Sequence, residues 1–162
     1  MDEDKINKLP PDVKKQFIKY ALKLSEKKKK TKVNDDFLTF VKHVWPEFIE
    51  GRHHKEIADK FNDIANKKIK RLIINMPPRH TKSEFASFLL PAWMVGRRPN
   101  LKIIQTTHTT ELAIRFGRKA KTLMDSQEYK EVFDTRLRED SQAAGKWETE
   151  QGGEYYAAGV GS

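Results

Sequence analysis

The segment from Asn75 to Glu84 has the sequence NMPPRHTKSE, in which a lysine, Lys82, is followed by a hydroxyl residue, Ser83. Such a pair at the start of a helix can bind a phosphorylated ligand, because the ammonium group reaches the phosphates and the hydroxyl holds Mg²⁺. Backbone N–H groups at a helix N-terminus also favour an anion. The spacing therefore predicts a nucleotide-binding loop from Met76 to Ser83.

This loop departs from the usual pattern GxxxxGK[ST] at both glycines. Met76 occupies the first glycine position and Thr81 the second. Glycine is used at such positions because it tolerates positive φ angles and lets the backbone approach a phosphate closely. Thr81 must therefore reach the same geometry without that freedom, or build a looser loop. An ordinary helix N-terminus with a solvated lysine is the alternative interpretation.

Hydrophobic spacing predicts the elements that position the loop. Apolar residues three to four apart indicate helices at 11–28, at 37–45 and after the loop 48–54. Around the phosphate loop, the pattern predicts a buried strand at 71–75, a helix at 82–95 kinked by Pro91, a second buried strand at 101–107 and a helix at 109–124. Short runs at 147–160 fit a hairpin around Gly152-Gly153. This order favours an α/β fold with a parallel sheet.

The composition of the 162 residues is that of a globular protein, with 37% hydrophobic and 34% charged residues. No apolar run approaches the roughly 20 residues of a membrane helix, and no secretory signal is recognisable, so we expect a cytosolic protein without a membrane partner. The absence of cysteine excludes disulfide scaffolds and thiolate metal sites.

The net charge is +9, and residues 1–33 contain eleven lysines against five acidic side chains. This excess fits a polyanionic partner such as double-stranded DNA, because neutralised phosphates release counterions. A lysine-rich helix that is simply solvated explains the charge equally well.

Several segments, in the right order, resemble the ATPase domain of phage large terminases. The loop Pro77–Glu84 resembles the PPRHGKSE loop of one branch of that family, with Thr81 in place of the glycine. Further segments that resemble the family are Phe88–Trp93, Gly96–Pro99, Ile103–His108, Leu112–Arg118, Trp147–Gly153 and Ala158–Gly161. The resemblance covers about 90 residues from Arg71 onward, and residues 1–50 match only loosely.

The resemblance implies a P-loop NTPase-type parallel sheet with flanking helices. Residues 51–162 are expected to form an incomplete ATPase core, preceded by a basic helical segment at residues 1–50. The chain is expected to stop before the second acidic motif, of Walker B type, and to lack the family's nuclease domain. We therefore expect a truncated domain that is marginally stable on its own, binds nucleotide weakly and hydrolyses ATP poorly.

Site residues follow from the same resemblance, with ATP and Mg as cofactors. Lys82 would neutralise the β- and γ-phosphates, Ser83 would ligate Mg²⁺, and Arg79 would touch the γ-phosphate. Lys82 and Arg79 are the candidate catalytic residues, although an ion pair with Glu84 is the alternative role of Arg79. The candidate nucleotide-binding residues are Pro77, Pro78, Arg79, His80, Thr81, Lys82, Ser83 and His54.

Upstream of the loop, the sequence Arg52-His53-His54 stands about where related ATPases contact adenine. His54 is the first candidate, with Phe48 or His53 next. Two adjacent histidines also suggest a metal, but no other ligand has a convincing spacing. A capping or packing role is therefore the simpler alternative.

The function implied is that of a DNA-packaging ATPase, which drives double-stranded phage DNA into a procapsid. Its partners would be the portal protein and the small terminase subunit, in a ring of subunits, in the host cytoplasm and transiently at the procapsid. One alternative is a helicase-like ATPase, which the PPRH prefix argues against. Another is a non-catalytic basic module that binds DNA or protein through the helix at 11–28.

Overall fold

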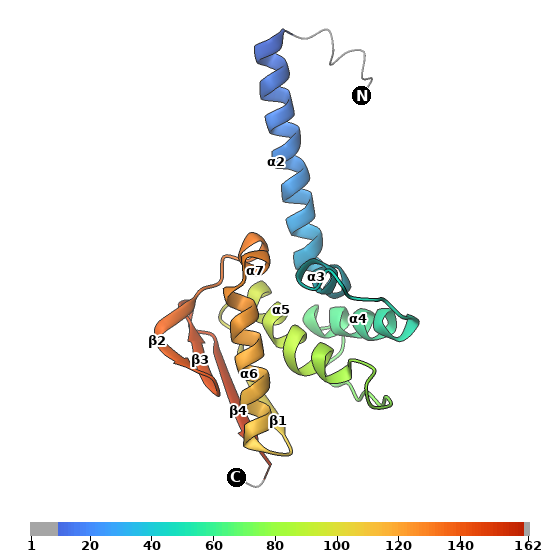
Figure 1. Ribbon diagram of the computed structural model, residues 1–162, viewed down its shortest axis with the longest axis vertical. Coiled ribbons are helices and arrows are strands. Elements are labelled where there is room, and N and C mark those ends of the chain that lie inside the picture. The colour runs from blue at the N-terminus through green and yellow to red at the C-terminus, as the bar shows by residue number, and fades with distance from the viewer. Residues whose placement is uncertain (1–9, 161–162) are drawn as a thin grey trace.

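The computed structural model describes residues 10–160, in which helices precede a sheet (Figure 1). The expectations for residues 1–9 and for Gly161 and Ser162 lie outside the described residues. The helices before the sheet are α2 (Pro11–Asp35), α3 (Phe37–Val44), α4 (Arg52–Ala65), the π-helix η1 (Glu84–Leu89) and α5 (Leu90–Arg97). The remaining elements are β1 (Lys102–Thr107), α6 (Thr110–Asp125), α7 (Gln127–Val132), β2 (Leu137–Ala143), β3 (Lys146–Thr149) and β4 (Glu154–Gly159).

The sheet is mixed rather than parallel. Its strand order is β1-β4-β3-β2, with β1 and β4 parallel and the other two pairings antiparallel. The α/β class is therefore confirmed, together with the helices packed on the sheet, whereas an all-parallel sheet is wrong. The antiparallel pairs arise because β2, β3 and β4 follow one another through short turns, which only antiparallel neighbours allow.

The strand predicted at 71–75 is not formed. These residues have no regular secondary structure and belong to no strand of the described sheet. Their apolar residues alternate in burial: Leu72 and Ile74 pack against the core, while Ile73 is 86% exposed. A continuous apolar run predicts a strand buried on both faces, whereas here only one side of the backbone meets apolar neighbours.

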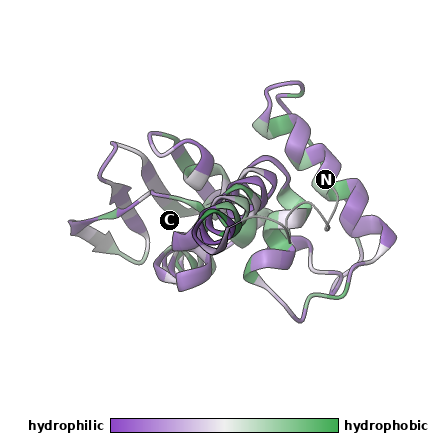
Figure 2. Cartoon of the chain, turned by 90° about the horizontal axis from the view of Figure 1, so that it is seen from above, coloured by the Kyte–Doolittle hydropathy of each residue, from purple (hydrophilic) through white to green (hydrophobic). Residues whose placement is uncertain are grey.

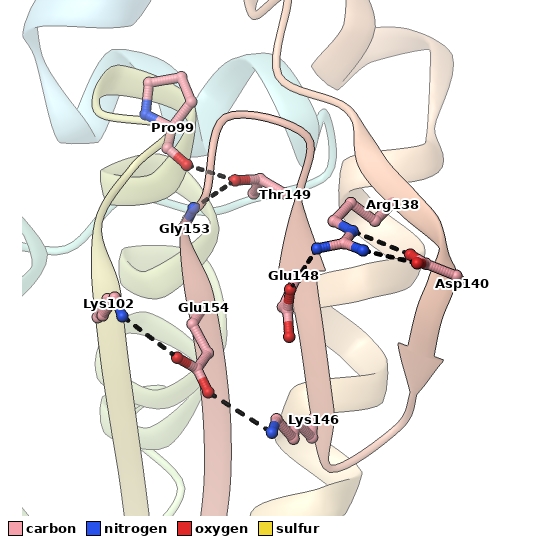
Figure 3. A network of polar contacts seen from close by, with 9 residues as sticks. All are labelled: Pro99, Lys102, Arg138, Asp140, Lys146, Glu148, Thr149, Gly153 and Glu154. Atoms are coloured by element: carbon pink, nitrogen blue, oxygen red, sulfur yellow. Dashed lines mark hydrogen bonds and ion pairs between the residues drawn. The ribbon is translucent and has the colours of Figure 1, made fainter.

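The hairpin predicted at 147–160 is confirmed as β3 and β4, joined by a turn in which Gly152 has φ +82°. Thr149 fixes this turn: its Oγ1 accepts from the Gly153 N–H at 2.8 Å and donates to the Pro99 carbonyl at 2.5 Å (Figure 3). The turn is thereby tied to the residues that lead into β1.

The two faces of the sheet differ. On the face toward α6, Trp147 and Tyr155 stack with ring centroids 4.7 Å apart, and neither is exposed. Burial raises the pKa of the Tyr155 hydroxyl to about 12. On the other face, Ile104 is 75% and Tyr156 49% exposed. β1 is also an edge of the described sheet, so its outer backbone N–H and C=O groups have no partner strand in the described sheet.

Beside these apolar residues, ion pairs run across the strands. Glu154 of β4 lies 3.6 Å from the Lys102 ammonium of β1 and 3.7 Å from that of Lys146 in β3 (Figure 3). Arg138 of β2 similarly bridges Glu148 in β3 at 3.0 Å. Pairs of this kind stabilise little when solvated, but opposite charges on neighbouring strands favour the observed register.

The helix after the loop from Met76 to Thr81 begins at Lys82, as predicted, but residues Glu84–Leu89 are π-helical rather than part of a kinked α-helix. Pro91 explains this, because its nitrogen has no proton to donate and its ring crowds the carbonyl four residues earlier. The Leu90 N–H accordingly bonds to the Phe85 carbonyl, five residues back. Such π-turns often occur beside functional sites.

The long helix α2 extends away from the rest of the chain (Figure 1). It is longer than the predicted helix at 11–28, and Val33 is its buried residue. The Trp93 indole N–H donates to the Val33 carbonyl at 3.3 Å and so attaches the end of α2 to the core.

Hydrophilic residues predominate in the chain as seen from above (Figure 2). Within residues 10–160, no helix has the length and apolar character needed to cross a membrane.

Asp36 joins α3 to α4 and gives a first prediction. Its carboxylate caps α3 by accepting from the Thr39 N–H at 2.7 Å and hydroxyl at 2.6 Å, and it accepts from the Asn62 amide at 2.9 Å. Burial alone would raise the pKa of this carboxyl, but these hydrogen bonds outweigh burial and lower it from the ordinary 3.8. The ionised Asp36 carboxylate therefore stabilises the folded protein at pH values above the ordinary pKa of 3.8. This contribution is lost as the pH falls through the lowered pKa of the folded state.

We expect Asp36→Ala to lower the free energy of unfolding by about 1–2 kcal/mol, the usual cost of a lost helix cap. Urea denaturation at pH 7 measures this. The matched control is Asp35→Ala, which removes the exposed neighbouring carboxylate. Equal effects of the two changes would contradict the capping role.

Candidate phosphate-binding loop

The structure brings the predicted loop residues together around an open hollow of about 330 Å³. The hollow is lined by Pro77, Pro78, Arg79, Thr81, Lys82, Ser83 and Glu84. Lys82 and Ser83 are exposed and lie in the first helical turn, whose N–H groups have no intrahelical acceptor. Side chains and backbone donors of the kind that bind an anion thus converge on one space.

Two residues of this loop have a left-handed backbone, and the residue between them does not. Arg79 has φ +65° and Thr81 has φ +60°, while His80 between them is not in the left-handed region. A left-handed residue next to a right-handed one turns successive N–H groups inward and builds an anion-binding concavity, called a nest, and the two left-handed residues here are compatible with one. Each left-handed non-glycine residue costs about 1–2 kcal/mol, and a β-branched residue such as Thr81 is a genuine outlier there. Thr81 therefore reaches the geometry for which glycine is normally used.

The Thr81 side chain is held by a residue from another element. The His54 Nε2 lies 2.7 Å from Thr81 Oγ1, and the Thr81 hydroxyl donates to the His80 carbonyl at 2.6 Å. The other ring nitrogen of His54, Nδ1, accepts from the Gly51 N–H at 2.8 Å. His54 is in the first turn of α4, so α4 begins earlier than the predicted 48–54 loop allowed.

His54 is 6% exposed, and its ring lies between aromatic side chains. Its centroid is 4.8 Å from that of Phe48 and 5.1 Å from that of Phe85. Burial, followed by repulsion from the neighbouring His53, lowers the pKa of His54 below the ordinary 6.5. The ring is therefore neutral at pH 7. Phe48, His53 and His54, the candidates for contact with adenine, do lie together, and their contact with a base stays a prediction.

His80 is exposed, and its Nδ1 lies 2.9 Å from the Pro78 carbonyl. A carbonyl can only accept, so Nδ1 carries the proton and the free Nε2 of the neutral ring can only accept. His80 could therefore bond a phosphate oxygen only in its protonated form. Its ring also lies 5.8 Å from that of His53.

The alternative role of Arg79, an ion pair with Glu84, is not seen. The Glu84 carboxylate bonds instead to the Lys119 ammonium of α6, at 2.7 and 2.9 Å. Neither Arg79 nor Lys82 has an ion pair among residues 10–160. Both cations next to the hollow thus remain available to an anionic ligand, and the first carboxylate of the helix is neutralised by another cation.

Sequence reasoning missed the links that hold the loop. The contact between His54 and Thr81 joins residues 27 positions apart, and no periodicity relates them. The Glu84–Lys119 pair spans 35 positions in the same way. The only local signal was the threonine at a glycine position, which called for a compensating interaction. Among residues 10–160, no group of three or more His, Asp or Glu side chains could hold a metal ion.

Comparison of the chain with models of known protein families, with curated proteins and with solved structures found no match.

The positive φ angle of Arg79 leads to a prediction for which Lys67, a third non-glycine residue with positive φ, is the control. Lys67, just after the end of α4, has φ +61° and lies outside the loop. Replacing Lys67 or Arg79 by glycine should raise the free energy of unfolding by up to about 1 kcal/mol, because glycine tolerates positive φ. Chemical denaturation measures this.

Only Arg79→Gly should also weaken the binding of pyrophosphate, because it removes a cation from the hollow. A calorimetric titration of both variants distinguishes the two effects. If Lys67→Gly weakened pyrophosphate binding as much as Arg79→Gly, the charge of Arg79 would have no special role in the loop.

Proposed function

We propose that the chain binds the phosphates of Mg·ATP in the loop from Met76 to Ser83. The observation that carries this proposal is the backbone of the loop, in which two non-glycine residues, Arg79 and Thr81, adopt left-handed φ angles directly before a helix that starts with Lys82 and Ser83. Strained backbone of this kind persists where surrounding contacts enforce it, and it concentrates at functional sites. Here it supports an anion site.

The side chains around the hollow fit distinct parts of a nucleotide triphosphate. Lys82 would neutralise the β- and γ-phosphates, and the Ser83 hydroxyl would ligate Mg²⁺. Arg79, which also lines the hollow, would contact the γ-phosphate. The pair Pro77-Pro78 fixes the entry to the loop, because proline restricts its own φ and disfavours helix at the preceding residue.

We further propose that this site belongs to the ATPase part of a phage large terminase, which packages double-stranded DNA with the portal protein and the small subunit. The support is the PPRH-T-KSE loop and the ordered segments that follow it. The exposed hollow with free cations is also what such a site requires. A helicase-like ATPase shares the lysine and serine but not the preceding Pro-Pro-Arg-His.

Nucleotide binding and nucleotide hydrolysis are separate parts of the proposal. Hydrolysis needs a carboxylate to activate water and a second one to hold Mg²⁺. None of the strands described in residues 10–160 ends in an acidic pair that faces the hollow. We therefore propose that this chain binds Mg·ATP and turns it over poorly.

Calorimetric titration with Mg·ATP tests the proposal. Lys82→Ala should weaken binding at least about tenfold, because hydrogen bonds to charged groups contribute about 1.5–3 kcal/mol each. Ser83→Ala should reduce the dependence of binding on Mg²⁺. The matched control is Lys60→Ala, which removes an exposed lysine from α4, away from the hollow. No binding by the folded wild-type chain, or equal binding by Lys82→Ala, would refute the nucleotide site.

The structure also favours a second candidate function, DNA binding through α2. This helix carries nine lysines and three acidic residues, and it extends into solvent, where a duplex could reach it (Figure 1). The basic-module interpretation of the sequence requires this geometry. Apolar side chains such as Ile18 and Tyr20 are exposed among the lysines, at 48% and 63%.

If α2 binds DNA, then replacing Lys14, Lys15 and Lys19 by glutamine should weaken binding and make it less dependent on salt. The slope of log affinity against log salt should fall by about 0.9 for each DNA phosphate that the variant no longer neutralises. Fluorescence anisotropy with a labelled duplex at several salt concentrations measures this slope. Lys55, Lys60 and Lys68, changed together, provide the control. An unchanged slope in the α2 variant would contradict DNA binding through α2 and would mean that its lysines are simply solvated.

A further inference from the structure

The contact between α4 and the phosphate loop depends on the orientation of one imidazole. The Gly51 N–H can only donate, so His54 Nδ1 accepts and the ring proton must be on Nε2. Nε2 then donates to Thr81 Oγ1, whose own proton is left for the His80 carbonyl. Every donor in this series of hydrogen bonds has an acceptor. The direction of the whole series is set by the Gly51 N–H and the His80 carbonyl, because a backbone N–H can only donate and a carbonyl can only accept.

Packing contacts hold the His54 ring in place. Phe48 and Phe85 pack on it, and Phe85 is 1% exposed in the core. A side chain at position 51 would come within 2.9 Å of the His53 ring and 3.4 Å of His54 Nδ1, so glycine leaves the space that the two imidazoles occupy. His54 is therefore a rigid, neutral hydrogen-bond donor held by the core and aimed at a strained residue.

We propose that His54 is a positioning residue, which holds the loop in its anion-binding conformation by hydrogen bonding to Thr81. A glycine at position 81 would adopt the left-handed φ without help, whereas threonine does so only while its hydroxyl is held. The consequence for ligand affinity rests on the proposed nucleotide site. The hydrogen bond itself does not, and it can be measured without a ligand.

Acid should release this hydrogen bond. A proton added at Nδ1 would face the Gly51 N–H, so the ring would have to leave its present position. The titratable groups that face His54 are His53 in α4, Glu50 before it and His80 in the loop. Glu50 favours the charged ring, whereas burial and the two histidines oppose it, so the hydrogen bond persists at neutral pH and breaks only below the ordinary pKa of histidine, about 6.5.

The first test examines the hydrogen bond in the 162-residue chain without nucleotide. NMR spectra of the histidine ring nitrogens should show His54 with its proton on Nε2, protected from exchange. Thr81→Ser keeps the hydroxyl and should keep this signal. Thr81→Val keeps the β-branched shape but removes the hydroxyl, and the exchange of the Nε2 proton should become fast. The same spectrum in both variants would overturn the proposal.

The second test asks whether the hydrogen bond sets affinity for Mg·ATP. Thr81→Val should weaken binding by up to about tenfold, the upper range for one neutral hydrogen bond, and Thr81→Ser should recover most of that affinity. His54→Gln should weaken binding to a similar extent, with tryptophan fluorescence verifying the fold. In the Thr81→Gly background, His54→Gln should have less than about a twofold effect, because glycine no longer needs the hydrogen bond.

The pH dependence separates this role from a general one in folding. Between pH 7.5 and 5.5, affinity should fall more steeply for the wild type than for Thr81→Gly. Effects of pH that do not act through the hydrogen bond to Thr81, such as protonation of ATP, are common to both proteins and cancel in the comparison. Parallel pH profiles, or equal effects of His54→Gln in both backgrounds, would overturn the positioning role. If even the wild type failed to bind Mg·ATP, the proposed function would fail, and the NMR comparison would still decide whether the hydrogen bond exists.

Discussion

The packing of Phe37 against three other aromatic rings is the interaction on which the rest of the structure depends. Phe37 opens α3, and its ring lies 5.1 Å from Phe61 of α4, 5.4 Å from Phe85 of η1 and 5.3 Å from Trp93 of α5. All four are almost completely buried. Edge-to-face pairs of this kind contribute about 0.5–1.5 kcal/mol beyond the burial of their area. Three segments that are separate in the sequence, namely α3, α4 and the continuous helix formed by η1 and α5, are thereby fixed relative to one another.

The loop from Met76 to Ser83 is connected to this cluster through Phe85. The residue follows the loop by a few positions and is shared by two groups of rings, because it contacts Phe37 on one side and His54 and Phe48 on the other. Displacement of Phe85 would therefore move both the start of the helix and the imidazole that bonds to Thr81. The conformation of an exposed loop here depends on contacts in the core, which explains how so open a site can keep a strained backbone.

The sequence was sufficient to predict the elements that have a clear period. The spacing of Phe37, Phe40 and Val41 gave α3, the spacing in 109–124 gave α6, and the glycine pair at 152–153 gave the hairpin. The strand at 71–75 failed because an apolar run shows that a segment meets the core but not whether a neighbouring strand pairs with it. The strand β2, at 137–143, was missed because its charged residues look like a loop, although Arg138 pairs with Glu148 across the hairpin.

The site was predictable to a similar degree. The start of the helix at Lys82 follows from a local pattern and is confirmed, whereas the roles of Lys82 and Ser83 in binding stay predictions. The source of the loop geometry was not predictable, because the group that holds Thr81 comes from α4. A pattern along the chain can show that a residue is unusual for its position, as Thr81 is, but it cannot show which distant residue compensates.

A glycine and a held threonine solve the same geometric problem in different ways. Glycine makes a left-handed φ angle accessible through its own lack of a side chain, at the expense of order in the free loop. Threonine restricts the backbone more strongly, so a single hydrogen bond from a buried donor can select one conformation and fix it before any ligand arrives. Preorganisation of this type lowers the entropic cost of binding. It also makes the loop sensitive to the protonation of His54 and to the packing of Phe85. A loop with glycine at position 81 would respond far less to either change.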